Sequence, residues 1–266
     1  MPIAEVNGQR LHFEDTGGDG PVVAFSHGLF MDGSMFDPQV AALRDRYRCI
    51  TWDERGHGET GEVGEDFTYW DSARDLAALL EHVGVQQAVL VGMSQGGYLS
   101  QRLAIERPEL VRGLVLIATQ AGDDTEKREA YDQLLEGWMA NGLGDELAQT
   151  IAAIVIGPGD PSAPHWIERW RRNTADNLRR IYGTLISRED LTPRLGEIQA
   201  PSLVLWGEED LAITRERAEA LTQGIPEAEL VAIPGAGHGV NFTHPDQLNP
   251  HLERFLARVA PVGAAA

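Results

Sequence analysis

The stretch "LVGMSQGGYL", residues 90–99, decides the fold class of this 266-residue chain. Its apolar start predicts the end of a buried strand, and the residues from Tyr98 onward predict a helix. Ser94 falls between the two, where so tight a turn forces the backbone toward a positive φ. Because Gly92 and Gly96 have no side chain, the strand and the helix can approach closely around that serine.

The same alternation of short apolar runs and helical patterns recurs along the chain. It predicts a mostly parallel sheet with helices on both faces, the α/β class. The first two strands, joined by Asn7-Gly8, instead predict a hairpin. Strands are expected at 3–6, 11–14, 22–28, 49–52, 88–92, 110–119, 202–207 and 228–235, and helices at 36–46, 70–83, 95–106, 214–223 and 246–259.

Residues 119–195 break the alternation, because they contain several helical patterns and no strand run. They carry Trp138, Trp166 and Trp170, half of the six tryptophans. We therefore expect a core of residues 1–118 and 196–266, with 119–195 as a helical insertion over the carboxyl edge of the sheet.

The overall composition excludes several classes of protein. The 22 Lys and Arg residues against 41 Asp and Glu residues give a net charge of −19, which argues against nucleic acid and anionic membrane surfaces as partners. No apolar run approaches the ~20 residues of a membrane-spanning helix, and the N-terminus lacks the pattern of a signal peptide. Cys49 is the single cysteine, so no disulfide forms within the chain, and we expect a cytoplasmic protein.

Ser94 has the surroundings of a nucleophile. The pattern G-x-S-x-G between a strand and a helix lifts the serine hydroxyl out of the backbone and points the helix N-terminus toward it. The backbone amide of Gln95 then points where an oxyanion would form. A second amide is expected from Leu29, or from Phe30 as the alternative, since Gly28 allows close backbone approach there.

A serine nucleophile needs a base, and the base needs an acid that orients it. Among eight histidines, His238 alone follows the last predicted strand on a glycine-rich loop. Asp210, just past the preceding strand, is the favoured acid. Its competitors are Glu208 and Glu209 in the same loop, and Asp123 and Asp124 after an earlier strand.

At this point the chain resembles the α/β-hydrolase superfamily over nearly its whole length. The resemblance lies, in the family's order, in "SHGLFMDGSMF", "WDERGHGET", "GMSQGG", "LWGEEDLAI" and "GAGHGVNFTHP". It implies that Ser94, Asp210 and His238 form a catalytic triad, and that the amides of Leu29 and Gln95 form the oxyanion hole. It also implies that the turn at 53–58 is structural and that the insertion is a lid over the substrate pocket.

These features predict a serine hydrolase of carboxylic esters or lactones that works through an acyl-enzyme. The alternatives are C–C bond hydrolysis, or perhydrolysis of the cofactor-free haloperoxidase kind, on the same triad, and outside enzymes a small-molecule receptor with vestigial hydrolysis. No cofactor and no metal is implied. The substrate is expected to be a small, uncharged and hydrophobic molecule. The sequence leaves the oligomeric state open. The residues expected to line the pocket are Phe30, Met31, Trp138, Trp166, Trp170 and Val240. For the tryptophans, the alternative is that they only pack the insertion onto the core.

Overall fold

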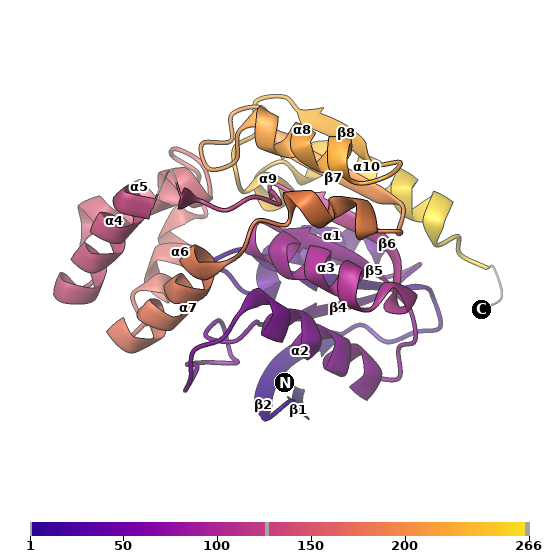
Figure 1. The fold of residues 1–266 in the computed structure, drawn as a ribbon, viewed down its shortest axis with the longest axis horizontal. Coiled ribbons are helices and arrows are strands. Elements are labelled where there is room, and N and C mark those ends of the chain that lie inside the picture. Colours follow the sequence, from indigo (N-terminus) through magenta and orange to yellow (C-terminus); the bar gives the residue numbers. More distant parts are fainter. Residues whose placement is uncertain (1, 126–127, 264–266) are drawn as a thin grey trace.

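The computed structural model describes residues 2–125 and 128–263, and in them one eight-stranded sheet forms the centre of the molecule (Figure 1). The strand order is β1-β2-β4-β3-β5-β6-β7-β8; β1 and β2 run antiparallel to their neighbours, and the others are parallel. The predicted α/β class is confirmed. The strands are β1 (Ile3–Val6), β2 (Gln9–Asp15), β3 (Val22–Ser26), β4 (Arg48–Trp52), β5 (Ala88–Met93), β6 (Val111–Ile117), β7 (Ser202–Gly207) and β8 (Glu229–Ile233).

The register of the central strands gathers their carboxyl ends at one edge. Ser26, the last residue of β3, pairs with Trp52 at the end of β4 and with Gly92 near the end of β5. The loops that follow these three strands therefore start side by side. They contain the predicted oxyanion segment, the "DERGHG" turn and the serine, so the topology alone brings these motifs together.

Helices cover both faces of this sheet, with α2 packed against α3 and α1 against α10 (Figure 1). Helix α2 begins with a capping box, in which Thr68 and Asp71 each bond the other's backbone amide. A four-residue helix, α9, follows the predicted base in a stretch where the sequence predicts a loop. The helices outside the insertion are α1 (Asp37–Leu43), α2 (Tyr69–His82), α3 (Gln95–Glu106), α8 (Arg215–Gly224), α9 (Val240–Thr243) and α10 (Pro245–Val259).

The segment between β6 and β7 is helical, and its described residues contain no strand. In the described part of this segment, four α-helices gather at one side of the molecule, seen at the left of Figure 1: α4 (Arg128–Asn141), α5 (Asp145–Val155), α6 (Ala163–Trp170) and α7 (Ala175–Ser187). The predicted boundary at 195/196 falls within a short 3₁₀ helix, Thr192–Glu197. We refer to α4–α7 as the helical insertion below.

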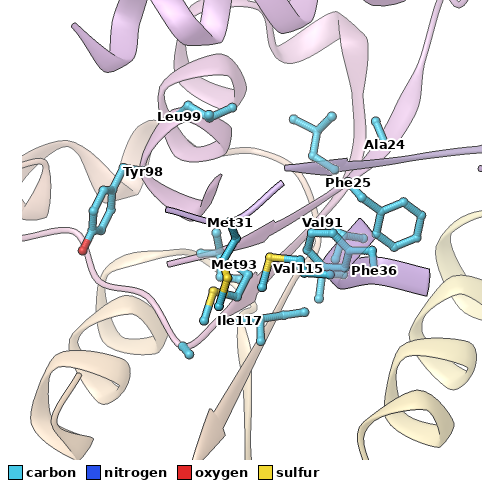
Figure 2. Close-up of a cluster of buried hydrophobic side chains, with 14 of the residues drawn as sticks. Ala24, Phe25, Met31, Phe36, Val91, Met93, Tyr98, Leu99, Val115 and Ile117 are labelled. Carbon is cyan, nitrogen blue, oxygen red and sulfur yellow. The ribbon is translucent and has the colours of Figure 1, made fainter. Parts of the chain in front are cut away.

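The core consists of strand side chains and the segments that pack on them. Figure 2 shows part of it, where Phe25, Val91 and Val115 from three neighbouring strands lie with Phe36 in one buried cluster. Cys49 is also buried, and this burial raises the pKa of its thiol to about 12, so the thiol is unreactive. In the described part of the chain, no helix is both long and apolar enough to cross a membrane.

Candidate active site

Ser94 stands at a strained turn between β5 and α3. Its φ is +50°, and it is the N-cap of α3. The glycines around it are required by contact distance: a Cβ on Gly92 would lie 2.3 Å from the carbonyl oxygen of Gly96, and a Cβ on Gly96 1.9 Å from that of Ser26. Any side chain at these positions would force the strand and the helix apart.

Two hydrogen bonds from β6 and the residues after it hold this turn in place. The amide of Ser94 donates to the carbonyl oxygen of Ile117 at 2.8 Å, and the hydroxyl of Thr119 donates to the carbonyl oxygen of Ser94 at 2.7 Å. Both backbone polar groups of the serine are therefore satisfied by a neighbouring strand and its loop. The strained backbone is therefore held by its surroundings, and among the described residues the Ser94 hydroxyl has no hydrogen-bond partner.

His238 and Asp210 form a buried pair. Nδ1 of His238 lies 2.9 Å from Oδ2 of Asp210, and their side chains are 5% and 0% exposed. The amides of Ala212 and Ile213 donate to Oδ1 of Asp210 at 2.8 and 2.9 Å, which fixes the plane of the carboxylate. This arrangement places the proton of a neutral His238 on Nδ1. Nε2 is then the unprotonated nitrogen, which can accept a proton.

The competing acids lie elsewhere. Glu208 and Glu209 are exposed, as is Asp123. Asp124 is buried, but its carboxylate is bound by Arg188 at 2.6 Å and Arg217 at 2.8 Å. Burial raises the pKa of Asp124, but the two arginines and Gln120 together outweigh it, so the pKa lies below its usual value.

One apolar cavity is lined by the candidate nucleophile and the candidate base. Ser94 and His238 line it together with Leu29 and Gln95, the residues predicted to supply the oxyanion amides. The wall facing the core is completed by Gly28, Phe30, Met93 and Tyr98, and by Ala212 and Ile213 beside the acid. The helical insertion and the loop before it supply the rest: Asp124, Tyr131, Leu134, Leu135, Ile151, Ile154, Val155, Tyr182 and Leu185.

The two predicted oxyanion amides are available for a ligand. Among the described residues, neither the amide of Leu29 nor that of Gln95 has a hydrogen-bond partner. Gly28 permits the approach of their segments, since a Cβ there would lie 2.7 Å from Sδ of Met93. Phe30, the alternative donor, has a left-handed backbone with φ of +64° and lines the cavity.

The expected set of pocket residues needs correction, because only Phe30 of the six lines this cavity. Trp138 and Trp170 are 2% and 0% exposed and pack behind Phe30, with ring centroids 5.1 and 6.4 Å away. Trp166 packs on Phe242. The large apolar area of an indole is most stabilising when fully buried, and these three serve the contact between insertion and core.

Met31 and Val240 are also buried and outside the lining of this cavity. Met31 borders a second, more polar cavity beside the "RGHG" turn, where Arg169 pairs with Asp32. Val240 belongs to α9, and its side chain is fully buried.

The residues that do line the insertion side follow a helical pattern that was visible in the sequence. Tyr131, Leu134 and Leu135 on α4 have the spacing i, i+3, i+4, and Ile151, Ile154 and Val155 on α5 repeat it. The spacing identifies an apolar face. It does not tell whether that face meets the core or a cavity, which depends on how each helix is rotated in the assembled molecule.

The "DERGHG" turn is held by buried polar contacts. Asp53 accepts the amides of Gly33 and Glu59 at 2.8 and 2.9 Å, and Arg55 binds Asp75 through two nitrogens. Burial lowers the pKa of His57 to about 3, helped by nearby His27, so its ring is neutral. These contacts agree with the structural role that the resemblance implied for this turn.

No cluster of three metal-ligating side chains occurs within residues 2–125 and 128–263.

Comparison with known proteins places the chain in a family. Residues 21–245 match the family described as "alpha/beta hydrolase fold", so the chain belongs to it. Hydrolysis is the general class of activity that this family and the relatives below support.

Three similar proteins illustrate the range of these relatives. A protein of Agrobacterium fabrum named "Putative carbamate hydrolase RutD" is 29% identical over 92% of this chain and 98% of its own length. A bifunctional esterase/perhydrolase of Acinetobacter calcoaceticus is 27% identical over 96% of this chain and 98% of its own length. The crystal structure of the enol-lactonase from Burkholderia xenovorans has a TM-score of 0.87 at 26% identity and covers 96% of this chain and 100% of that one.

Proposed function

We propose that the protein is a serine hydrolase that cleaves carboxylic esters or lactones through an acyl-enzyme. The observation that carries this proposal is the cavity in which Ser94, on its strained turn, and His238, bonded to a buried carboxylate, meet two unpaired backbone amides. Nucleophile, base, orienting acid and oxyanion donors are the complete set that acyl transfer requires. A receptor would need the cavity but not this set.

In the proposed reaction, the hydroxyl of Ser94 attacks the carbonyl carbon while Nε2 of His238 takes its proton. The negative charge on the former carbonyl oxygen is stabilised by the amides of Leu29 and Gln95, which are already oriented before the substrate binds. His238 then protonates the leaving alkoxide. A water molecule, deprotonated by the same nitrogen, attacks the acyl-enzyme and releases the acid and Ser94.

The lining of the cavity indicates the substrate class. Leucine, isoleucine and valine side chains of α4, α5 and α7 form most of its insertion side. Among the described lining residues Asp124 is the one carboxylate, and it is already paired with two arginines. Such a site favours an uncharged, apolar acyl group or lactone ring, since a charged group would lose its hydration without gaining a partner.

A labelling experiment tests the proposal directly. Wild-type protein should react with a fluorophosphonate probe at Ser94 and hydrolyse p-nitrophenyl butyrate, and Ser94→Ala should lose the label and at least about 10⁴-fold in kcat. The melting temperature of the variant should stay close to that of the wild type, because only a hydroxyl is removed. Retention of a tenth of the activity by a pure Ser94→Ala sample, or a wild type that takes no label, would refute the proposal.

A second candidate uses the same acyl-enzyme with hydrogen peroxide in place of water. The observation that favours it is the similarity to the bifunctional esterase/perhydrolase. Attack of peroxide on the acyl-enzyme would release a peracid and restore Ser94, with the proton passing through His238. Bromination of monochlorodimedone in the presence of acetate, peroxide and bromide measures this activity. Its loss in Ser94→Ala would distinguish it from background oxidation.

A further inference from the structure

A buried chain of hydrogen bonds, outside the reaction described above, connects the two oxyanion donors beneath the cavity. At its middle is Glu54, on the loop after β4, which is 1% exposed and does not line the cavity. One branch runs from its side chain to Gln95, and the other from its backbone to His27.

The first branch fixes the side chain of Gln95. Its Nε2 donates to a carboxyl oxygen of Glu54, and its Oε1 accepts the hydroxyl of Tyr69 at 3.1 Å. Nε2 of His57 lies 3.5 Å from the same amide nitrogen. Gln95 is the first residue of α3, so contacts that fix its side chain also restrict the direction of its own backbone amide.

The second branch reaches the peptide that carries the other donor. The amide of Glu54 donates to Nε2 of His27 at 2.9 Å, which assigns the ring proton to Nδ1. That Nδ1 in turn donates to the carbonyl oxygen of Gly28 at 2.8 Å. Because the carbonyl of Gly28 and the amide of Leu29 belong to one planar peptide unit, this bond fixes where the Leu29 amide points.

We propose that Glu54 is a positioning residue that holds the two oxyanion donors at their working separation, one through its backbone amide and the other through its carboxyl group. The inference rests on the proposed function, since it assigns a role toward the same oxyanion. It predicts that loss of the carboxyl contact weakens stabilisation of the transition state more than binding of the substrate.

The charge state of Glu54 suits this role. Burial raises its pKa to about 8; the side chains of Ser72 and Gln95 and the guanidinium of Arg55 act in the opposite direction, and Asp75 adds to the increase. At neutral pH the group is therefore an uncharged carboxyl, and His57 beside it is uncharged as well. No buried negative charge then opposes the oxyanion above it, so a glutamine at position 54 should serve equally well.

The test compares two substitutions at this position. Glu54→Leu removes the acceptor for Gln95, and we expect kcat/KM to fall about 10- to 100-fold, less than the loss of an entire oxyanion donor, with KM within about threefold of wild type. The affinity for an alkyl trifluoromethyl ketone should fall by the same factor, because this inhibitor forms a hemiketal oxyanion on Ser94. Glu54→Gln keeps a neutral acceptor and should stay within about threefold of wild type in both measurements.

Two further variants separate positioning from general stability. Thr184→Val removes a buried hydroxyl that donates to the carbonyl oxygen of Phe67, and it should lower the melting temperature without changing the ketone affinity. Gln95→Leu breaks the same contact from the other side and keeps the backbone amide. It tests the proposal even if Glu54→Leu does not fold.

The outcomes are distinct. If folded Glu54→Leu and Gln95→Leu bind the ketone as tightly as wild type does, Glu54 has only a structural role and the inference is wrong. A fall in ketone affinity that Glu54→Gln fails to restore also overturns it. If the wild type does not hydrolyse esters, or Ser94→Ala still does, the proposed function itself fails, whatever the result at position 54.

Discussion

At the scale of single residues, the candidate site depends on how Asp210 holds His238. The carboxylate is fully buried, accepts two backbone amides on one oxygen and binds Nδ1 of the histidine mainly through the other. An imidazole held in this way has a fixed ring orientation, as a general base requires, and gains a stabilising partner when it becomes protonated. The two neighbouring glutamates are exposed and have no comparable contact to replace it.

Replacing the acid tests this assignment. Asp210→Asn should lower kcat/KM by roughly 10³- to 10⁴-fold, because the amide can donate to Nδ1 and stabilise the wrong tautomer of His238. Glu208→Gln and Glu209→Gln, the matched controls from the same loop, should each cost less than about tenfold. Steady-state kinetics on p-nitrophenyl butyrate measures all three. A severe loss in Glu209→Gln with an active Asp210→Asn would place the acid one residue earlier.

Sequence reasoning could single out Ser94, Asp210 and His238 as candidates because the placement of each depends on the local chain. Ser94 is set by glycines within two positions of it, and Asp210 and His238 each follow a strand in the loop at its carboxyl end. Glu54 shows the opposite case. The role proposed for it depends on contacts with residues 27 and 41 positions away in the sequence, and the motif "DERGHG" does not indicate those contacts.

At the scale of elements, apolar periodicity predicted most strands and helices within a few residues, and it missed α9, which is a single turn long. It also predicted that the segment after β6 is helical. What it did not predict is the rotation of those helices. The tryptophans are the largest apolar side chains of the insertion, and size favours full burial against the core, whereas the cavity is lined by the smaller side chains of α4, α5 and α7.

This difference predicts which positions of the insertion control substrate preference. Leu134→Ala removes a side chain that lines the cavity, and apolar contacts worth about 1–3 kcal/mol should be lost for a long acyl chain. The kcat/KM for p-nitrophenyl octanoate should then fall about 5- to 100-fold relative to that for the acetate. Trp170→Ala should instead destabilise the fold by roughly 3–5 kcal/mol and leave the octanoate-to-acetate ratio unchanged.

Kinetics on the two esters and a thermal melt of each variant make this comparison. If Trp170→Ala changes the ratio and Leu134→Ala does not, the cavity that contains Ser94 and His238 does not hold the acyl chain against α4.

At the scale of the whole molecule, two buried ionisable groups near the candidate site affect the free energy of unfolding. Glu54 and His57 are buried on either side of the Gln95 amide, and both are uncharged at neutral pH. An unfolded chain would return each of them to water, where the ordinary pKa values apply. The stability of the protein must therefore depend on pH, with an effect of opposite sign from each group.

The sign for Glu54 follows from its two pKa values, 4.5 for a glutamate in water and about 8 in the fold. Between these values the folded protein keeps a proton that the unfolded chain releases, so the free energy of unfolding decreases as pH rises, by up to ~1.4 kcal/mol per pH unit, and levels off above the folded pKa. His57 acts on the acid side, where stability decreases as pH falls from 6.5 toward about 3. The difference in free energy of unfolding between a Glu54 variant and wild type separates the effect of the glutamate from that of the histidine, because His57 is present in both.

Glu54→Gln cannot ionise, so its free energy of unfolding relative to wild type should increase steadily from about pH 5 to about pH 8 and then stay constant. Denaturant titrations at half-unit pH steps measure this difference. The exposed Glu208→Gln is the control and should show no such trend. A constant difference between Glu54→Gln and wild type over the whole range would mean that Glu54 is ionised in the fold. A charged carboxylate would then lie beneath the oxyanion amides, and the neutral contact proposed for Gln95 would be wrong.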